Sequence, residues 1–389
     1  MKTLQIVPAL DQGGVERGVV EMNRVISSEG WRNVVVSSGG RLVAQIERDG
    51  GRHVALDVKG KNPLTCLSRA AALRRVLESE RPDVVCVHSR VPAWLFRIAN
   101  RGLGLRWITF AHGANSISPY SRVMTAGDLV VTPSRFLADY LKAAYGTPEE
   151  RIRVIPRAID AARFDPSRLD MEFVGRMKRE WGVENSRVVM GLGRITQLKG
   201  YDILIHAARY LKATHEAARV KTPAYKFVIV GEAEEGRRKY AAELVALAER
   251  LGVKDDVVFA GAQSKVAECL SIADVVVSAN YRKPESFGRS MAEALAMNRP
   301  VVATAFGGAL DIVKDGVNGA LVAKMPGEPP EERAVAFANA IRCVAHSEFG
   351  DLRSGVLERF SFGRMAKASL DVYRELAAKG AAGGKGDGR

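Results

Sequence analysis

Apolar residues along this chain of 389 residues gather in short, nearly continuous runs that alternate with stretches of helical spacing. In the first half the runs are T-L-Q-I-V-P, N-V-V-V-S-S, H-V-A-L-D-V, D-V-V-C-V-H, W-I-T-F-A-H and L-V-V-T-P. Strands that are apolar on both faces are typical of parallel sheets with helices on each side. The first half therefore predicts a doubly wound α/β domain.

The same alternation restarts in the second half, after a segment without clear periodicity. This segment, residues 154–168, contains two prolines, and we interpret it as the interdomain linker. Five further strand-like runs follow: V-V-M-G-L-G, K-F-V-I-V-G, V-V-F-A-G, D-V-V-V-S-A and P-V-V-A-T-A. From Pro330 to about Ala378 the spacing is helical, and the Gly-, Ala- and Lys-rich end predicts a flexible terminus.

The whole pattern predicts two Rossmann-like domains that face each other across a cleft, with ligands at the carboxyl ends of their strands. We expect the first domain in residues 1–160 and the second in residues 161–355. Residues 356–378 would carry a C-terminal helix that crosses back to the first domain, and residues 379–389 a flexible tail.

Composition narrows the range of functions. The formal net charge of +14 suits nucleic acid, an anionic membrane surface or a phosphate-bearing substrate. The basic residues are spread along the chain, without zinc-knuckle spacing or an RRM-type aromatic pair, which disfavours nucleic acid.

Four cysteines in apolar contexts, without C-x-x-C spacing, favour buried, reduced thiols over a disulfide framework or a metal site. No apolar run approaches the roughly 20 residues of a spanning helix, and the apolar start is too short for a signal peptide, so we expect a cytoplasmic protein.

The strongest local signal for chemistry is P-E-S-F-G-R-S-M-A-E-A-L-A, residues 284–296. Pro284 and Gly288 predict a loop that enters a helix, where unpaired N–H groups and the helix dipole favour a phosphate. Glu285 precedes this helix and Glu293 lies on its second turn, about 9–12 Å further along the axis. The two carboxylates could hold hydroxyls at both ends of one nucleotide sugar; the alternative is two solvated surface glutamates.

A second signal is G-L-G-R-I-T-Q-L-K-G-Y, residues 191–201. A strand ends there, a loop with glycines follows, and Arg194 and Lys199 flank the turn into the next helix. Guanidinium and ammonium groups bind phosphate oxygens, so the two cations could neutralise a departing diphosphate. The alternative is two ordinary surface cations.

Further candidates follow strands of the first domain. Gly13 and Gly14, in D-Q-G-G-V-E-R-G, would free the backbone to approach a ligand where a helix starts, although the segment does not match G-x-G-x-x-G. His112 follows an apolar strand in F-A-H-G-A, and His88 ends another, two residues before Arg90. Each is also consistent with a structural role, and for His88 we favour the structural one.

Together these pieces resemble the retaining glycosyltransferases of family four, which have the GT-B fold. The matching segments are Q-G-G-V-E-R-G, A-H-G-A, T-P-S-R-F, V-I-P-R-A-I-D, G-R-I-T-Q-L-K-G, V-G-E-A-E, P-E-S-F-G-R-S-M-A-E-A and D-G-V-N-G-A-L-V. The chain departs from the family at R-A-I-D, residues 157–160, where Asn-Gly-Ile/Val-Asp is usual. It also departs at V-G-E-A-E, residues 230–234, where V-G-x-G-P is usual, and at Asp311, where many members have Glu.

The resemblance implies a role for each candidate. Arg194 and Lys199 would bind the donor diphosphate, and Glu293 the ribose. Glu285 and the following backbone would hold the donor sugar and phosphate, and His112 would lie near the transferred sugar. The implied sets are catalytic Glu285, His112, Arg194 and Lys199; donor-binding Gly13, Gly14, Ser286, Phe287, Gly288 and Glu293; and, on the acceptor side, His88 and Arg90. Neither a metal nor a cofactor would be needed, because the helix start and the two cations take the metal's place.

The implied reaction transfers a hexose from a UDP-, GDP- or ADP-sugar to a lipid-linked or oligosaccharide acceptor of the cell envelope, with retention at the anomeric carbon. The fragments P-A-L-D-Q-G-G-V-E-R-G and H-S-R-V-P-A-W look like enzymes that build bacterial lipopolysaccharide core. Two alternatives stay open. An epimerase of the same fold would need no acceptor, and a non-catalytic nucleotide-sugar-binding protein would need no cations for a leaving group.

One basic segment bears on the acceptor. Residues 58–77 contain five Lys and Arg residues, Arg69 among them, and no acidic residue. Cys66, Ala70, Leu73 and Leu77 follow helical spacing and predict one apolar face, so that Arg69 and Arg75 would project elsewhere. The segment is either a solvated helix packed on the sheet or a surface that docks on an anionic membrane or glycolipid at the inner face of the cytoplasmic membrane.

Overall fold

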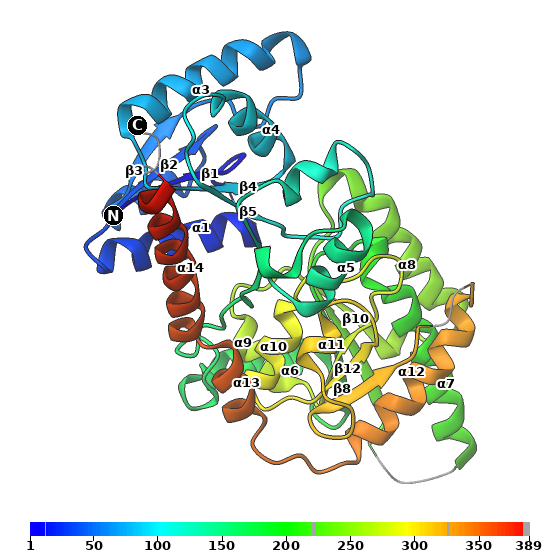
Figure 1. Ribbon diagram of the computed structural model, residues 1–389. Helices are drawn as coiled ribbons and strands as arrows, with labels where there is room; N and C mark the ends of the chain where they lie inside the picture. The colour runs from blue at the N-terminus through cyan, green and yellow to red at the C-terminus, as the bar shows by residue number, and fades with distance from the viewer. Residues whose placement is uncertain (12, 219–222, 325–326, 384–389) are drawn as a thin grey trace, which may run out of the picture. The chain divides into compact units, whose positions relative to one another are not determined.

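The computed structural model describes residues 1–11, 13–218, 223–324 and 327–383, and the chain divides into two compact units (Figure 1). Unit 1 comprises Met1–Arg157 together with the C-terminal segment from Gly363, and unit 2 comprises Ala158–Phe362. Each unit has one sheet, and the neighbouring strands described in both sheets run parallel. The prediction of two doubly wound α/β domains is therefore confirmed.

The sheet of unit 1 has seven strands in the order β3-β2-β1-β4-β5-β6-β7. They are β1 (Lys2–Ile6), β2 (Arg32–Ser37), β3 (Arg52–Ala55), β4 (Val84–His88), β5 (Trp107–Phe110), β6 (Leu129–Thr132) and β7 (Ile152–Val154). The central strand β4 is buried along its whole length. Burying one valine side chain contributes on the order of 1.5–3 kcal/mol, so these apolar runs are stable only in the interior of the unit.

The helices of unit 1 include the last long helix of the chain. They are α1 (Gly14–Ser28), α2 (Val43–Arg48), α3 (Cys66–Glu80), α4 (Arg90–Ala99), α5 (Arg135–Tyr145) and α14 (Phe362–Gly383). Two ion pairs tie α14 to this unit, Arg153–Glu375 and Arg374–Glu29, each at 2.8 Å. The helix runs past Ala378, where the sequence suggested its end, because the alanine-rich stretch is a good helix former. Residues 384–389 of the expected flexible tail lie outside the described residues.

The sheet of unit 2 has six strands in the order β10-β9-β8-β11-β12-β13. They are β8 (Arg187–Leu192), β9 (Tyr225–Val230), β10 (Val257–Gly261), β11 (Val275–Ser278), β12 (Val301–Thr304) and β13 (Gly319–Val322). Val188 and Met190 belong to one hydrophobic core and Val189 to another, because successive side chains of a strand point to opposite faces. Two cores on one sheet explain the continuous apolar runs.

Helices surround this second sheet. They are α6 (Met171–Trp181), α7 (Tyr201–Ala218), α8 (Arg238–Arg250), α9 (Val266–Ile272), α10 (Arg289–Ala296), α11 (Ala309–Ile312), α12 (Pro330–Ala345) and α13 (Leu352–Phe360). Among the described residues, no helix of either unit is both long and apolar enough to cross a bilayer.

Two strands, one in each unit, were not predicted from the sequence. β7 falls inside the segment interpreted as a linker, and β13 carries none of the dense valine pattern of its neighbours. Both lie at an edge of their sheet and are only partly buried. An edge strand is not surrounded by helices on all sides, so its sequence need not be apolar at every position.

The strand order of each sheet reverses at one strand. In unit 1 the order reverses at β1, which has β2 on one side and β4 on the other. In unit 2 it reverses at β8, between β9 and β11. In open α/β sheets, the carboxyl ends of the strands at such a reversal leave a crevice for ligands.

Candidate functional site

The loop after β8 is shaped by glycines so that it can hold the Lys199 side chain. Gly193 has φ +137° and Gly200 φ +67°, backbone conformations that other residues rarely adopt. A Cβ on Gly200 would lie 2.1 Å from the carbonyl oxygen of Ala279, just after β11, and one on Gly193 would lie 3.1 Å from Lys199 Cε. The loop therefore packs against the end of β11 and passes directly beside the lysine.

Lys199 and Glu285 form the centre of the site in unit 2. The Lys199 ammonium donates a hydrogen bond to Glu285 Oε1, and Asn280 Nδ2 donates to the same oxygen at 3.2 Å. The two charged side chains are only 24% and 23% exposed. The Glu285 backbone is also held, because its carbonyl oxygen accepts the N–H of Gly308 at 2.7 Å. A cation and an anion are thus fixed side by side at the carboxyl ends of the central strands.

The start of α10 offers N–H groups next to this ion pair in sequence. The N-cap residue is Gly288, with φ +99° and no side-chain cap, so the first amides of the helix find no side-chain acceptor in the described structure. A Cβ at Gly288 would lie 2.0 Å from Met291 Cε. Phe287 is buried and packs edge-on against Phe360, with ring centroids 5.2 Å apart, which anchors the loop that contains Ser286. Glu293 lies on the second turn and is half-buried.

Arg194 has a different environment from Lys199. Its side chain is 72% exposed and forms an ion pair with Glu234. Glu234 belongs to V-G-E-A-E, one of the segments in which the chain departs from the family pattern. Sequence reasoning noted the departure but did not predict this contact. Arg194 is therefore near the surface and already engaged by an acidic side chain.

In unit 1, the glycines after β1 differ in what surrounds them. A Cβ on Gly13 would lie 2.1 Å from Glu16 Oε2, so the Glu16 carboxylate folds back over the start of α1. A carboxylate there is favoured by the helix dipole. A Cβ on Gly14 would meet nothing within 4 Å. A Cβ on Gly14 would thus point into open space, whereas the Glu16 carboxylate lies beside Gly13. Contact of either glycine with a diphosphate stays a prediction.

His88 and His112, at the ends of β4 and β5, lie together. His88 Nδ1 is 3.0 Å from His112 Nε2, and Arg157 Nη2 is 2.8 Å from His112 Nδ1. Burial, followed by the charge of Arg157, lowers the pKa of His88 to about 3 and holds the pKa of His112 well below its ordinary value. Both rings are therefore neutral near pH 7.

Arg90 does not join this histidine pair. Its Nη1 donates to Ser121 Oγ at 3.1 Å, and its guanidinium lies 5.4 Å from the centre of the Tyr120 ring. The turn between His88 and Arg90 is unusual, because Ser89 has φ +97° and ψ 156°. A residue other than glycine rarely adopts this conformation, and such strain gathers at functional sites.

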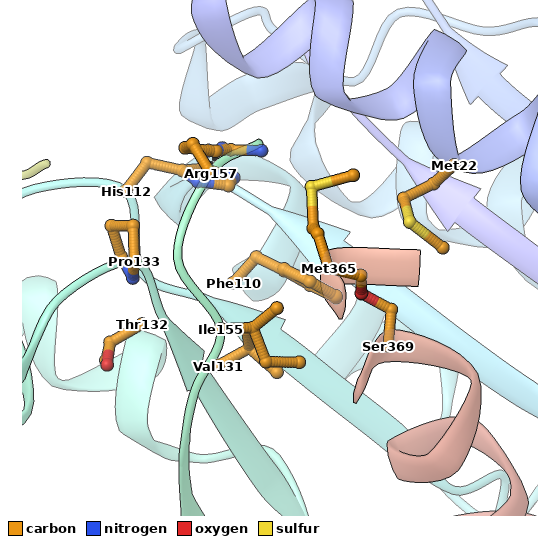
Figure 2. Close-up of a pocket in the computed structure, with 10 residues that line it drawn as sticks. All are labelled: Met22, Phe110, His112, Val131, Thr132, Pro133, Ile155, Arg157, Met365 and Ser369. Carbon is orange, nitrogen blue, oxygen red and sulfur yellow. Dashed lines mark hydrogen bonds between the residues drawn. The ribbon is translucent and has the colours of Figure 1, made fainter. Parts of the chain in front are cut away.

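A small cavity of about 30 Å³ lies beside the histidine pair (Figure 2). His112 and Arg157 line one end of it, and Met365 and Ser369 of α14 line another. The remaining lining residues are Met22, Phe110, Val131, Thr132, Pro133 and Ile155. Most of these lining residues are apolar, and His112 and Arg157, which are both partly buried, bring the polar groups.

The basic segment 58–77 agrees with the predicted helix except at Arg69. Ala70, Leu73 and Leu77 of α3 are buried, as the helical spacing predicted. Arg69, however, is buried as well, which corrects the expectation that it projects outward. Its guanidinium donates to the carbonyl oxygens of Gly60, Asn62 and Thr65 and so closes the loop before α3. Two leucines near the start of α3 are exposed, Leu64 in the loop by 90% and Leu67 in the first turn of the helix by 72%.

The last two predictions concern metal ligands and cysteines. Within the described ranges, no group of three or more His, Cys, Asp or Glu side chains is placed to hold a metal ion. The four cysteines are free; Cys86 and Cys269 are buried, whereas Cys343 is exposed, contrary to the expectation that all four are buried.

Comparison with known proteins identifies the family. Residues 12–163 match the family described as Glycosyltransferase Family 4, and residues 175–348 match the family described as Glycosyl transferases group 1. A D-inositol 3-phosphate glycosyltransferase from Acidothermus cellulolyticus is 29% identical over 81% of this chain and 72% of its own. The protein of the same name from Xylanimonas cellulosilytica is 31% identical over 77% of this chain and 68% of its own.

Solved structures agree with this family at the level of the fold. A glycosyltransferase from Rickettsia africae has a TM-score of 0.82 at 25% identity, and the match covers 96% of this chain and 98% of that one. HepE from Anabaena, solved in complex with UDP and glucose, has a TM-score of 0.75 at 21% identity, over 96% of this chain and 99% of its own. The chain therefore belongs to the GT-B glycosyltransferases that combine a Family 4 domain with a group 1 domain.

Proposed function

We propose that this glycosyltransferase moves a hexose from a nucleoside diphosphate sugar to an anionic acceptor, either a cell-envelope glycolipid such as lipopolysaccharide core or an inositol phosphate, with retention at the anomeric carbon and without a metal ion. The observation that carries the donor half of this proposal is the Lys199–Glu285 ion pair at the carboxyl ends of the central strands of unit 2. It offers a cation for a leaving diphosphate and a carboxylate for sugar hydroxyls, both held in place before any ligand arrives.

In this proposal the donor lies along the start of α10. Lys199 and the first amides of the helix take the phosphate oxygens, since helix N-termini favour anions. Glu285 accepts hydroxyls of the sugar, and Glu293, on the second turn, accepts those of the ribose. Arg194 adds a second cation once it leaves Glu234. The complex of HepE with UDP and glucose supports a donor of this class, whereas the choice among UDP, GDP and ADP rests on the experiment below.

Retention follows in this proposal from attack on the same face that the leaving group departs. The bond from the anomeric carbon to the phosphate oxygen breaks, and the acceptor oxygen forms the new bond on that face. The acceptor's hydroxyl proton passes to the departing phosphate oxygen. Lys199 stabilises the negative charge that develops there, the role that fixed cations perform best in a site partly shielded from water. A metal is not required, because the ammonium and the helix amides supply the positive charge.

The acceptor side of the proposal rests on charge. Lys and Arg counted against Asp and Glu give unit 1 a net charge of +12 and unit 2 a net charge of +2, which together make the +14 of the chain. Such an asymmetry raises the local concentration of anionic molecules at unit 1. Two acceptors carry the required negative charge. Lipopolysaccharide core is suggested by the sequence fragments, and an inositol phosphate by the names of the two relatives.

The loop before α3 supports peripheral contact with an anionic membrane at the inner membrane face. Leu64 of this loop and Leu67 of the first turn of α3 expose most of their apolar surface, and Lys59 and Lys61 of the loop are exposed. Apolar side chains at a loop tip can enter the headgroup region, and each nearby Lys contributes about 1 kcal/mol of attraction to anionic lipid. Arg69 holds the loop in shape from inside. A lipid-linked acceptor would be reached in this way.

The experiment that tests the proposal is an acceptor panel with radiolabelled UDP-, GDP- and ADP-hexoses. Inositol phosphate and lipopolysaccharide core acceptors are offered separately, and the anomeric configuration of the product is read by NMR. Transfer to one acceptor with retained configuration supports the proposal. Inversion would overturn the mechanism, and donor turnover with an epimerised sugar and no transfer would favour the epimerase. Donor binding without any turnover would favour the binding protein.

A further inference from the structure

Arg157 is the one residue of the histidine cluster that the sequence analysis did not select. It stands where the family usually has Asn, and it is the last residue of unit 1 before the chain enters unit 2. Its Nη2 lies 2.8 Å from His112 Nδ1. A Cβ on Gly18 of α1 would lie 2.3 Å from its Nη1. The guanidinium therefore fits between the His112 ring and a helix position that has no side chain (Figure 2 shows Arg157 beside His112).

The chemistry of arginine determines where the protons of both imidazoles lie. A guanidinium only donates, so Nδ1 of His112 must accept and carries no proton. The proton of the neutral His112 ring is then on Nε2, which donates to Nδ1 of His88 at 3.0 Å. His88, neutral for its part, must carry its own proton on Nε2. One donor at Arg157 thus fixes the tautomers of two rings.

The surroundings of His88 and His112 favour the neutral form of both imidazole rings. His88 is buried and stacks on Phe110, with ring centroids 4.6 Å apart. Desolvation and the charge of Arg157 both lower the pKa of the two histidines. At the far end of the chain of bonds, Nε2 of His88 is buried and finds no partner in the described part of the structure. A buried N–H without an acceptor is unfavourable, and this one lies next in sequence to Ser89, whose φ is +97°.

We propose that Arg157 is a positioning residue that holds His112 and His88 in their Nε2–H tautomers. The absence of a side chain at Gly18 leaves the space that the Arg157 guanidinium occupies. His112 then has no ring nitrogen left to act as a general acid or base, and it contributes shape and a fixed polar edge instead. The consequence for sugar transfer rests on the proposed function. The assignment of the tautomers is independent of the proposed function, because they are properties of the ligand-free protein.

The test is the nitrogen NMR spectrum of the full-length protein labelled with ¹⁵N-histidine. The chain has six histidines, and a His112→Gln variant and a His88→Gln variant assign the two relevant rings. In the unmodified protein at pH 7 we expect both rings in the Nε2–H form. In Arg157→Leu, His112 should lose its single tautomer and show exchange between the two forms. Arg157→Lys, which keeps a donor and its charge, should restore a larger fraction of the Nε2–H form.

A second variant keeps the proposal testable even if Arg157→Leu fails to fold. Gly18→Ala keeps Arg157 but places a methyl group where its guanidinium lies, so this variant should show the same tautomer exchange at His112. The matched control is Gly363→Ala in α14, where a Cβ meets nothing within 4 Å and the spectrum should not change. The proposal is overturned if His112 carries its proton on Nδ1 in the unmodified protein. It is also overturned if Gly18→Ala leaves the His112 signals as they were.

Discussion

Lys199 and Glu285, 86 residues apart in sequence, share an ion pair, and Asn280 donates to the same carboxylate oxygen. The pair joins the loop after β8 to the loop before α10. Because both side chains are about three-quarters buried, each holds the other in a defined position. In the proposed function, donor binding would exchange these partners: the ammonium would turn to phosphate, and the carboxylate to sugar hydroxyls.

The Arg194–Glu234 pair predicts that removing Glu234 improves donor binding, whereas removing Arg194 slows turnover. Both side chains are at least half exposed, so the pair is worth at most about 1 kcal/mol. Glu234→Ala should free Arg194 and lower the KM for the donor by up to about fivefold. Arg194→Ala should lower kcat by about a hundredfold, the scale of losing one preorganised charge. Steady-state kinetics on both variants measures this; a Glu234→Ala enzyme with a raised donor KM would contradict the assigned role.

Metal removal gives a second prediction. Activity should persist in excess EDTA, because the charge of the leaving group is met by Lys199 and the amides of α10 in the proposed mechanism. The measurement is the initial rate of donor turnover before and after chelation, with added Mg²⁺ as the comparison. A rate that disappears with EDTA and returns with Mg²⁺ would show metal-assisted chemistry instead.

The sequence determined most of the fold and part of this site. Continuous apolar runs predicted buried parallel strands, and glycines beside charged residues predicted the two loops of unit 2. The Lys199–Glu285 and Arg194–Glu234 contacts could not be predicted, because they join residues from separate loops whose approach depends on tertiary packing. The sequence marks Arg157 as a departure from the family pattern. Its contact with His112 could not be predicted, because the two residues are far apart in sequence.

The basic segment shows why charge pattern alone misleads. Arg69 follows the same pattern as its exposed neighbours, yet its guanidinium is turned inward to satisfy three backbone carbonyls. Sequence spacing places a residue on a helix face, but it does not reveal unpaired carbonyl groups in an adjacent loop. Those groups decide whether an arginine is a surface charge or a structural donor.

Low pH should weaken the fold through the buried histidines. Their folded pKa values lie below the ordinary value of 6.5, with that of His88 at about 3, chiefly because of burial. Between these values the unfolded chain binds protons that the folded protein cannot, so stability falls as the pH drops below about 6.5. Each ring contributes on the order of 1 kcal/mol per pH unit.

Urea midpoints at pH 7 and pH 5.5 measure this effect. We expect His88→Gln to be less sensitive to acid than the unmodified protein, whatever its stability at pH 7. His346→Gln, which removes an exposed histidine of unit 2, is the matched control and should keep the original sensitivity. An unchanged difference between the two pH values in His88→Gln would contradict the assignment of His88 as a buried neutral ring.

The loop before α3 predicts binding to anionic vesicles. Leu64→Glu with Leu67→Glu should abolish co-sedimentation with phosphatidylglycerol vesicles, and Lys59→Glu with Lys61→Glu should weaken it most at low salt. Phosphatidylcholine vesicles are the lipid control. Met171→Glu, which changes a 67% exposed apolar residue of unit 2, is the protein control. Failure of the unmodified protein to bind, or binding that survives the leucine changes, would remove this surface from the account.

The central claim is that a nucleoside diphosphate sugar is bound and cleaved at the Lys199–Glu285 pair. It is tested most directly by release of nucleoside diphosphate from UDP-, GDP- and ADP-hexoses, compared between the unmodified enzyme, Lys199→Ala and, as a control, Lys254→Ala. Lys254 forms an exposed ion pair with Glu249 on the same unit. We predict that one donor is cleaved, that Lys199→Ala is slowed at least about a hundredfold, and that Lys254→Ala is unchanged. Cleavage by Lys199→Ala at the rate of the unmodified enzyme would contradict the account.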